Sequence, residues 1–130
     1  MTVTSSRHIQ VERRQDALVI ALLDNRITDS GHVHALHVWI QEATEPPQGG
    51  NANVVMIDFA NVEYLSSSML SVLVALQARL QRQGRRLVLA GLADTLRSIF
   101  RMTKLHRVFD IHDDAAEVIA SLPRPLARGA

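Results

Sequence analysis

The chain has 130 residues, 47% of them hydrophobic but only 4% aromatic, and a formal net charge of +1 at pH 7. This length favours one domain with an aliphatic core. The near-neutral charge does not suggest a nucleic-acid-binding protein, and the lack of cysteine excludes disulfides and zinc–thiolate sites. The N-terminus has no signal-peptide core and the longest uncharged stretch, Tyr64–Ala78, is too short for a bilayer, so we expect a cytoplasmic protein without membrane contact.

The N-terminal part of the chain has the pattern of two paired strands. Residues 1–7 are polar, and we expect them to be flexible. Ile9 and Val11 alternate with polar residues, which indicates a short strand with one polar face. Ala17–Leu23 is apolar throughout and predicts a more deeply buried strand that pairs with the first as a hairpin.

A first helix is predicted after the polar loop Asp24–Arg26. Thr28, Asp29 and Ser30 offer N-cap side chains, and Pro46-Pro47 cannot continue a helix, which should therefore stop by Glu45. The core-facing positions recur at helical spacing and are Val33, Leu36, Ile40 and Ala43.

The centre of the chain predicts a strand, a tight loop and a second helix. Val54–Ala60 is almost continuously apolar and is typical of a strand buried on both faces of a sheet. The polar hinge Asn61–Tyr64 follows, and the serines at 66–68 stand directly before the apolar segment Met69–Leu80. Hydroxyl groups should therefore lie at the carboxyl end of a central strand, where open α/β sheets usually bind ligands.

The last third of the chain repeats the alternation of strand and helix. Gly84 ends the second helix, and the pattern then predicts a strand at Leu87–Ala90, a helix from Leu92 to Arg101, an edge strand at Val108–Ile111 and a helix capped by Asp113. We expect one α/β domain over residues 8–122, with a four- to five-stranded, mixed, mostly parallel sheet and about four helices, followed by a flexible tail at 123–130.

Four segments in this order resemble the STAS domain of bacterial anti-sigma factor antagonists and sulfate transporter tails. They are Val54–Leu80, Gly84–Leu92, Leu105–Ile111 and Asp113–Ala116, and the resemblance covers most of Val11–Leu122. It implies a STAS-like fold and a regulatory, non-enzymatic protein that binds an anti-sigma factor, a serine-protein kinase, and is switched by serine phosphorylation.

The resemblance places Ser67 at the phosphoacceptor position, with Ser66 and Ser68 as alternative acceptors. In the family an aspartate precedes the switch serine and a small residue is common where this chain has Met69; here Ser66 replaces the aspartate. The alternative is that these serines only cap the helix, because a serine hydroxyl accepts hydrogen bonds from first-turn amides.

Six residues are predicted to form the partner-binding surface: Asp24, Ser66, Ser68, Met69, Leu70 and Arg97. Asp24 could instead only fix a turn, and Arg97 could belong to an ordinary charged helix surface together with Arg101. The apolar start of the second helix could be deeply buried or could form a partner or weak homodimer surface. Asp58 is expected to accept hydrogen bonds from loop amides.

We expect no metal and no cofactor. His34 and His37 could share a helical face, but this spacing arises easily and brings no complete ligand set, while His32 lies close to the helix start. An enzyme with a serine nucleophile is disfavoured because the Gly-x-Ser-x-Gly pattern and a Gly-rich phosphate loop are both absent. A STAS subunit that acts as a scaffold or sensor in a larger assembly, or binds a small ligand, stays as the alternative function.

Overall fold

The structure is a computed structural model that describes residues 3–5, 8–14, 16–45 and 52–121. The predicted C-terminal tail at 123–130 and part of the predicted flexible N-terminus lie outside these residues. Strand β1 (Val3–Ser5) lies within the segment that was predicted to be flexible and pairs with the following strand, so the sheet begins before residue 8. No apolar pattern marks β1 in the sequence, because a backbone ladder needs none.

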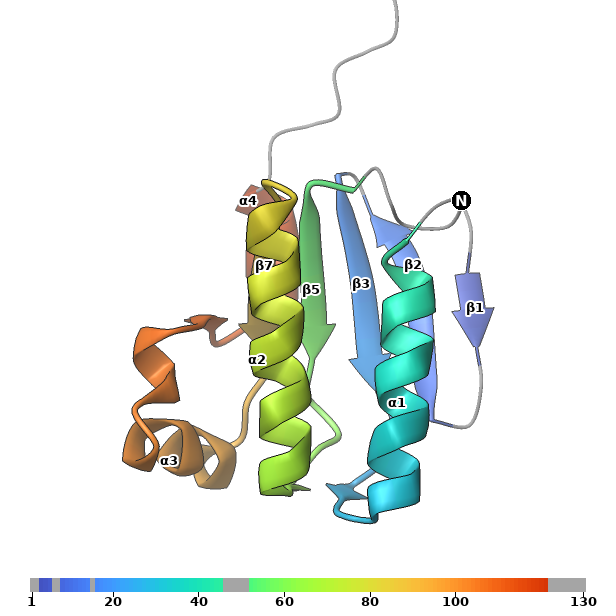
Figure 1. The fold of residues 1–130 in the computed structure, drawn as a ribbon. Coiled ribbons are helices and arrows are strands. Elements are labelled where there is room, and N and C mark those ends of the chain that lie inside the picture. Colours follow the sequence, from blue (N-terminus) through green and yellow to red (C-terminus); the bar gives the residue numbers. More distant parts are fainter. Residues whose placement is uncertain (1–2, 6–7, 15, 46–51, 122–130) are drawn as a thin grey trace, which may run out of the picture.

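The described residues form a main sheet of six strands, one more than the sequence predicted (Figure 1). Its order is β1, β2 (Ile9–Arg14), β3 (Ala17–Leu22), β5 (Val54–Asp58), β7 (Arg86–Ala90) and β8 (Asp110–His112). The first three strands pair antiparallel, whereas β3, β5, β7 and β8 pair parallel. The prediction of a mixed, mostly parallel α/β sheet is confirmed.

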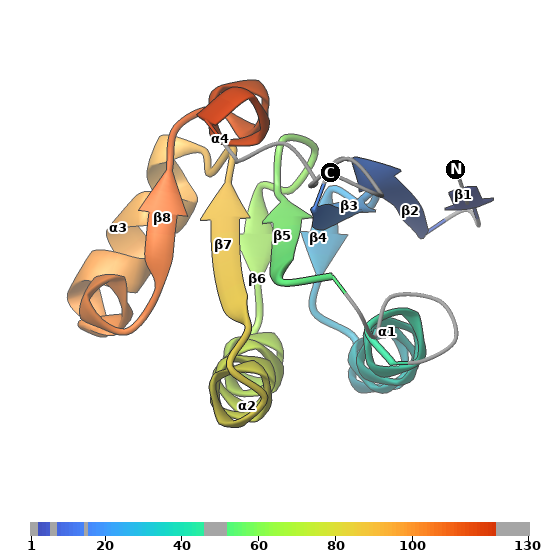
Figure 2. The same ribbon diagram turned by 90° about the horizontal axis from the view of Figure 1, so that it is seen from above.

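In the described part of the chain, four α-helices surround the sheet, as predicted. They are α1 (Ser30–Ala43), α2 (Ser67–Arg82), α3 (Asp94–Met102) and α4 (Ala115–Ser121). Helices α1 and α2 cover one face of the sheet and α4 lies on the other, while α3 stands at the β8 end (Figure 2). Among the described residues, no helix is long and apolar enough to cross a membrane.

Strand β5 is buried from both sides, which explains its nearly continuous apolar sequence. Val55 and Ile57 belong to the core beneath α1 and α2, whereas Val54 and Met56 belong to the smaller core beneath α4. Because side chains alternate along a strand, one strand contributes to both cores.

The chain between α3 and α4 differs from the prediction. Leu105–Arg107 forms the 3₁₀ helix η1, and the edge strand begins at Asp110 rather than at Val108, whose side chain is exposed. The last helix is capped by Asp114, which accepts a hydrogen bond from the Ala116 amide at 2.8 Å. The predicted cap, Asp113, instead forms an ion pair with Arg97.

A buried arginine joins the two sides of the loop that precedes β5. Arg85 donates from Nε to the Ala52 carbonyl at 2.7 Å and from one terminal nitrogen to the Thr44 carbonyl at 2.9 Å. Burial lowers the pKa of Arg85, and the charges of Arg79 and Arg13 lower this pKa further. Despite this burial, the guanidinium provides the hydrogen bonds that the buried Ala52 and Thr44 carbonyls need.

Truncation of Leu73 should destabilise the fold. Leu73 is fully buried on α2, and Leu73→Ala should leave a cavity and lower the free energy of unfolding by about 2–5 kcal/mol. Val74 on the same helix is 39% exposed, so the control Val74→Ala should change it by only about 0.5 kcal/mol. Urea denaturation measures the free energy of unfolding of both variants. Equal losses in the two variants would show that the Leu73 face of α2 does not pack in the core.

Candidate functional site

Two short connections pair with each other at the carboxyl ends of β3 and β5. Strand β4 (Arg26–Ile27) runs parallel to β6 (Tyr64–Leu65), with Arg26 opposite Tyr64. The Ser66 amide then donates to the Ile27 carbonyl at 2.9 Å. Both connections were predicted to be loops, because strands of two residues have no detectable periodicity. This small sheet fixes the start of α2 against the start of α1.

The three serines have different surroundings at the start of α2. Ser66 is the N-cap, and its hydroxyl oxygen accepts a hydrogen bond from the Met69 amide at 3.2 Å. Ser67 and Ser68 are exposed in the first turn, and neither hydroxyl makes a hydrogen bond to any residue that the structure describes. One serine therefore caps the helix, while the other two present their hydroxyl groups to solvent.

The apolar start of α2 belongs to the core. Met69 is fully buried and Leu70 is 8% exposed, and both pack in the cluster beneath α1 and α2. The prediction that they lie on a partner-binding surface is wrong for this fold, because the helix must cover the sheet from its first turn. Near this helix start, the described residues include one large exposed hydrophobic side chain. It is Tyr64 on β6, which is 41% exposed.

Asp58 fixes the loop after β5, as predicted. Its carboxylate accepts a hydrogen bond from the Ala60 amide at 3.0 Å. Gly91, which follows β7, lies against this turn with a positive φ of 74°. A Cβ atom at Gly91 would lie 2.9 Å from Asp58 Oδ1 and 3.3 Å from the Ala60 nitrogen. The ends of β5 and β7 therefore depend on a glycine at this position.

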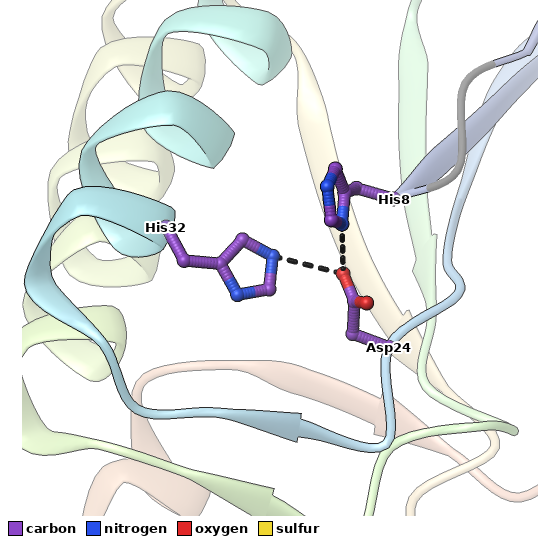
Figure 3. Close-up of side chains that lie close together, drawn as sticks. All are labelled: His8, Asp24 and His32. Carbon is purple, nitrogen blue, oxygen red and sulfur yellow. Dashed lines mark hydrogen bonds and ion pairs between the residues drawn. The ribbon is translucent and has the colours of Figure 1, made fainter.

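Asp24 lies after β3 and contacts two histidines (Figure 3). One of its carboxylate oxygens is 2.8 Å from His8 Nδ1 and 2.8 Å from His32 Nε2. The histidine pair that the sequence spacing had singled out, His34 and His37, is exposed on α1 and lies outside this cluster. Asp24 is half-buried, so its predicted contact with a partner would compete with these two histidines.

Arg97 lies on α3, in a different element from the serines at the start of α2. Its guanidinium pairs with Asp113 and lines a pocket between α3, η1 and β8, together with Phe100, Arg101 and His106. The structure therefore separates the predicted partner-binding residues into the helix start, the Asp24 cluster and this basic pocket.

A family model for the STAS domain, described as "Mlab, STAS domain", matches residues 9–112. The chain belongs to the STAS domain family. A sequence search of curated proteins found no significant match.

Solved structures share the STAS fold. A STAS domain protein from Planctomyces limnophilus superposes with a TM-score of 0.74 at 19% identity, covering 90% of this chain and 98% of that one. A putative anti-sigma factor antagonist from Thermotoga maritima has a TM-score of 0.70 at 19% identity, covering 88% and 93%. The phosphorylated form of the Bacillus cell fate determinant SpoIIAA has a TM-score of 0.64 at 19% identity, covering 86% and 96%. At these identities, the likeness establishes the fold.

The serines can be separated by their contribution to stability. Ser66→Ala removes the oxygen that accepts from the Met69 amide and should lower the free energy of unfolding by about 1 kcal/mol. Ser67→Ala removes an exposed hydroxyl and should change it by about 0.5 kcal/mol or less. Chemical denaturation of both variants checks this, and a larger loss for Ser67→Ala would contradict the assignment of the cap.

Two glycines provide a matched test of the Asp58 turn. Gly91→Ala should destabilise the chain more than Gly84→Ala, because both have a positive φ but a Cβ at Gly84 would meet nothing within 4 Å. The left-handed conformation costs each variant about 1–2 kcal/mol, and only Gly91→Ala adds a clash with Asp58 and Ala60. Thermal melts of the two variants give the difference, and equal melting temperatures would contradict the close approach.

Proposed function

We propose that this STAS domain is an anti-sigma factor antagonist that binds an anti-sigma factor, a serine-protein kinase, and is switched by phosphorylation of Ser67. Binding would sequester the kinase and release the sigma factor. The observation that carries the proposal is the position of Ser67. It is the first residue of α2, it is exposed, and it follows Ser66, whose hydroxyl oxygen caps the helix. A kinase could reach this hydroxyl without unfolding any part of the domain.

The helix start can accommodate a phosphate. A phosphoserine adds about two negative charges, and the free amides and positive dipole end of a helix stabilise an anion by about 0.3–1 kcal/mol. The first turn of α2 contains no acidic residue that would repel the added charge. Modification of Ser67 should therefore preserve the fold and change only the outer surface.

The docking surface that we propose is centred on exposed groups beside Ser67. Ser68 lies next to it in the same turn, and Tyr64 lies on β6 just before the helix, with the Arg26 guanidinium 5.0 Å above its ring. An aromatic ring and an arginine are frequent energetic centres of protein interfaces. These side chains replace the buried Met69 and Leu70 as the contacts that a partner would make.

Ser68 is the alternative acceptor, because its side chain is also exposed. Ser66 is a poorer acceptor, because it is half-buried and its hydroxyl oxygen is already held by the Met69 amide. The replacement of the family's aspartate by this capping serine also favours a second function, in which the domain is a scaffold or sensor subunit of a larger assembly that does not depend on phosphorylation.

Ser67→Asp should fold normally and lose affinity for the kinase partner, because docking would have to remove a negative charge from water. Ser67→Ala should fold and keep its affinity. We expect circular dichroism to show equal folding for both variants and calorimetry with the partner to show at least a tenfold weaker binding for Ser67→Asp, which corresponds to about 1.4 kcal/mol.

Direct detection of the phosphate separates the two functions. The chain is incubated with the partner kinase and ATP, and the peptide Val62–Arg79 is analysed by mass spectrometry, with Ser67→Ala as the control. Phosphate on Ser67 supports the switch. A peptide that stays unmodified, together with Ser67→Asp binding as tightly as the unaltered chain, would leave the scaffold or sensor function in its place.

A further inference from the structure

We propose that His8, Asp24 and His32 form a binding site for a divalent transition-metal cation of the zinc class. The three side chains come from separate parts of the chain: His8 precedes β2, Asp24 follows β3, and His32 lies in the first turn of α1 (Figure 3). Their potential ligand atoms all lie within 4.8 Å of one another. The site is independent of the proposed phosphorylation switch.

The separations are close to those of a metal-bound set. His8 Nδ1 and His32 Nε2 are each 2.8 Å from the same Asp24 oxygen. A tetrahedral ion with bonds of about 2.0–2.2 Å holds its ligand atoms about 3.4 Å apart. The three ligand atoms lie within 4.8 Å of one another, so side-chain movements of about an ångström would bring them to this spacing, with two imidazoles and one carboxylate as ligands and water at the fourth position.

One atom of the cluster lacks the hydrogen bond that its burial demands. His32 Nε2 is fully buried, and although it lies 2.8 Å from the Asp24 oxygen, it forms no hydrogen bond of acceptable geometry with any described residue. A buried polar atom without such a bond is costly. Coordination of a cation would satisfy this nitrogen. The nitrogen would then direct its lone pair at the metal, and it would no longer need to direct a proton at the Asp24 carboxylate.

The surrounding structure supports the two histidines of the cluster. The His8 ring stacks on Trp39 of α1, with ring centroids 5.5 Å apart and planes inclined by 14°. The His8 carbonyl accepts a hydrogen bond from the Leu23 amide at 2.9 Å, and the His32 amide donates to the capping Asp29 carboxylate at 3.0 Å. Ligands on such supported backbone lose little freedom when a metal binds.

The ligand types select the kind of cation. Imidazole and carboxylate together suit Zn²⁺ and its neighbours in the first transition series, whereas Mg²⁺ and Ca²⁺ prefer sites composed of oxygen atoms. Each coordinating ring nitrogen must be deprotonated, so the ring proton moves to the other nitrogen of the imidazole.

Calorimetry of the untagged, full-length chain with Zn²⁺ tests the site. We expect one ion per chain, at least about tenfold weaker binding in His8→Gln and in His32→Gln, and no saturable binding of Mg²⁺. His34→Gln is the matched control, because His34 lies two residues from His32 on the same helix but is exposed. An equal loss in His34→Gln, or binding by the double variant His8→Gln/His32→Gln as tight as in the unaltered chain, would overturn the proposal.

The single tryptophan gives a second measurement that requires no variant. Trp39 stacks on His8, so Ni²⁺ in this site should quench its emission saturably, and added Zn²⁺ should compete and restore the signal. This measurement decides the question if the histidine variants fail to fold by circular dichroism. An unaltered chain with neither a saturable zinc heat nor saturable quenching would show that the cluster is only a hydrogen-bonded one.

Discussion

The parallel alignment of β3, β5 and β7 is the constraint on which the rest of this structure depends. Ile20 lies opposite Ile57, and Ile57 lies opposite Leu89, so the three strands end at nearly the same level. Each strand of this set must be followed by a segment that leaves the same edge, and α1, α2 and α3 all begin there (Figure 1). Parallel pairing therefore gathers helix N-termini, turn residues and capping side chains on one surface.

The small sheet of β4 and β6 connects the features of this edge. Asp24 lies two residues before β4, and Ser66 follows β6 directly. Backbone hydrogen bonds join the two connections, from the Glu63 amide to the Asn25 carbonyl at 2.7 Å and from the Ser66 amide to the Ile27 carbonyl at 2.9 Å. The histidine–aspartate cluster and the serine helix start thus share one hydrogen-bonded support, although they are distant in sequence.

Burial decides which side chains of the site can meet a partner. A helix that covers a sheet from its first turn must direct apolar residues inward, which places Met69 and Leu70 in the core. Ser67 and Ser68 face solvent on the opposite side of the same turn. An apolar pattern at a helix start therefore could not distinguish a docking surface from the core. The sequence located the serine-rich start of α2 but not the burial of the apolar residues beside it.

The sequence by itself determined the order of the four helices and of strands β2, β3, β5, β7 and β8, the burial of β5 and the helical core stripe of α1, because side-chain periodicity is a local property. It also located the serines at a strand–helix junction. Only the tertiary structure decided that β1 extends the sheet, that β4 pairs with β6, and that Asp114 rather than Asp113 caps α4. The meeting of His8, Asp24 and His32 belongs to the same group, since residues from three segments become neighbours only when strand pairing and helix packing bring those segments together.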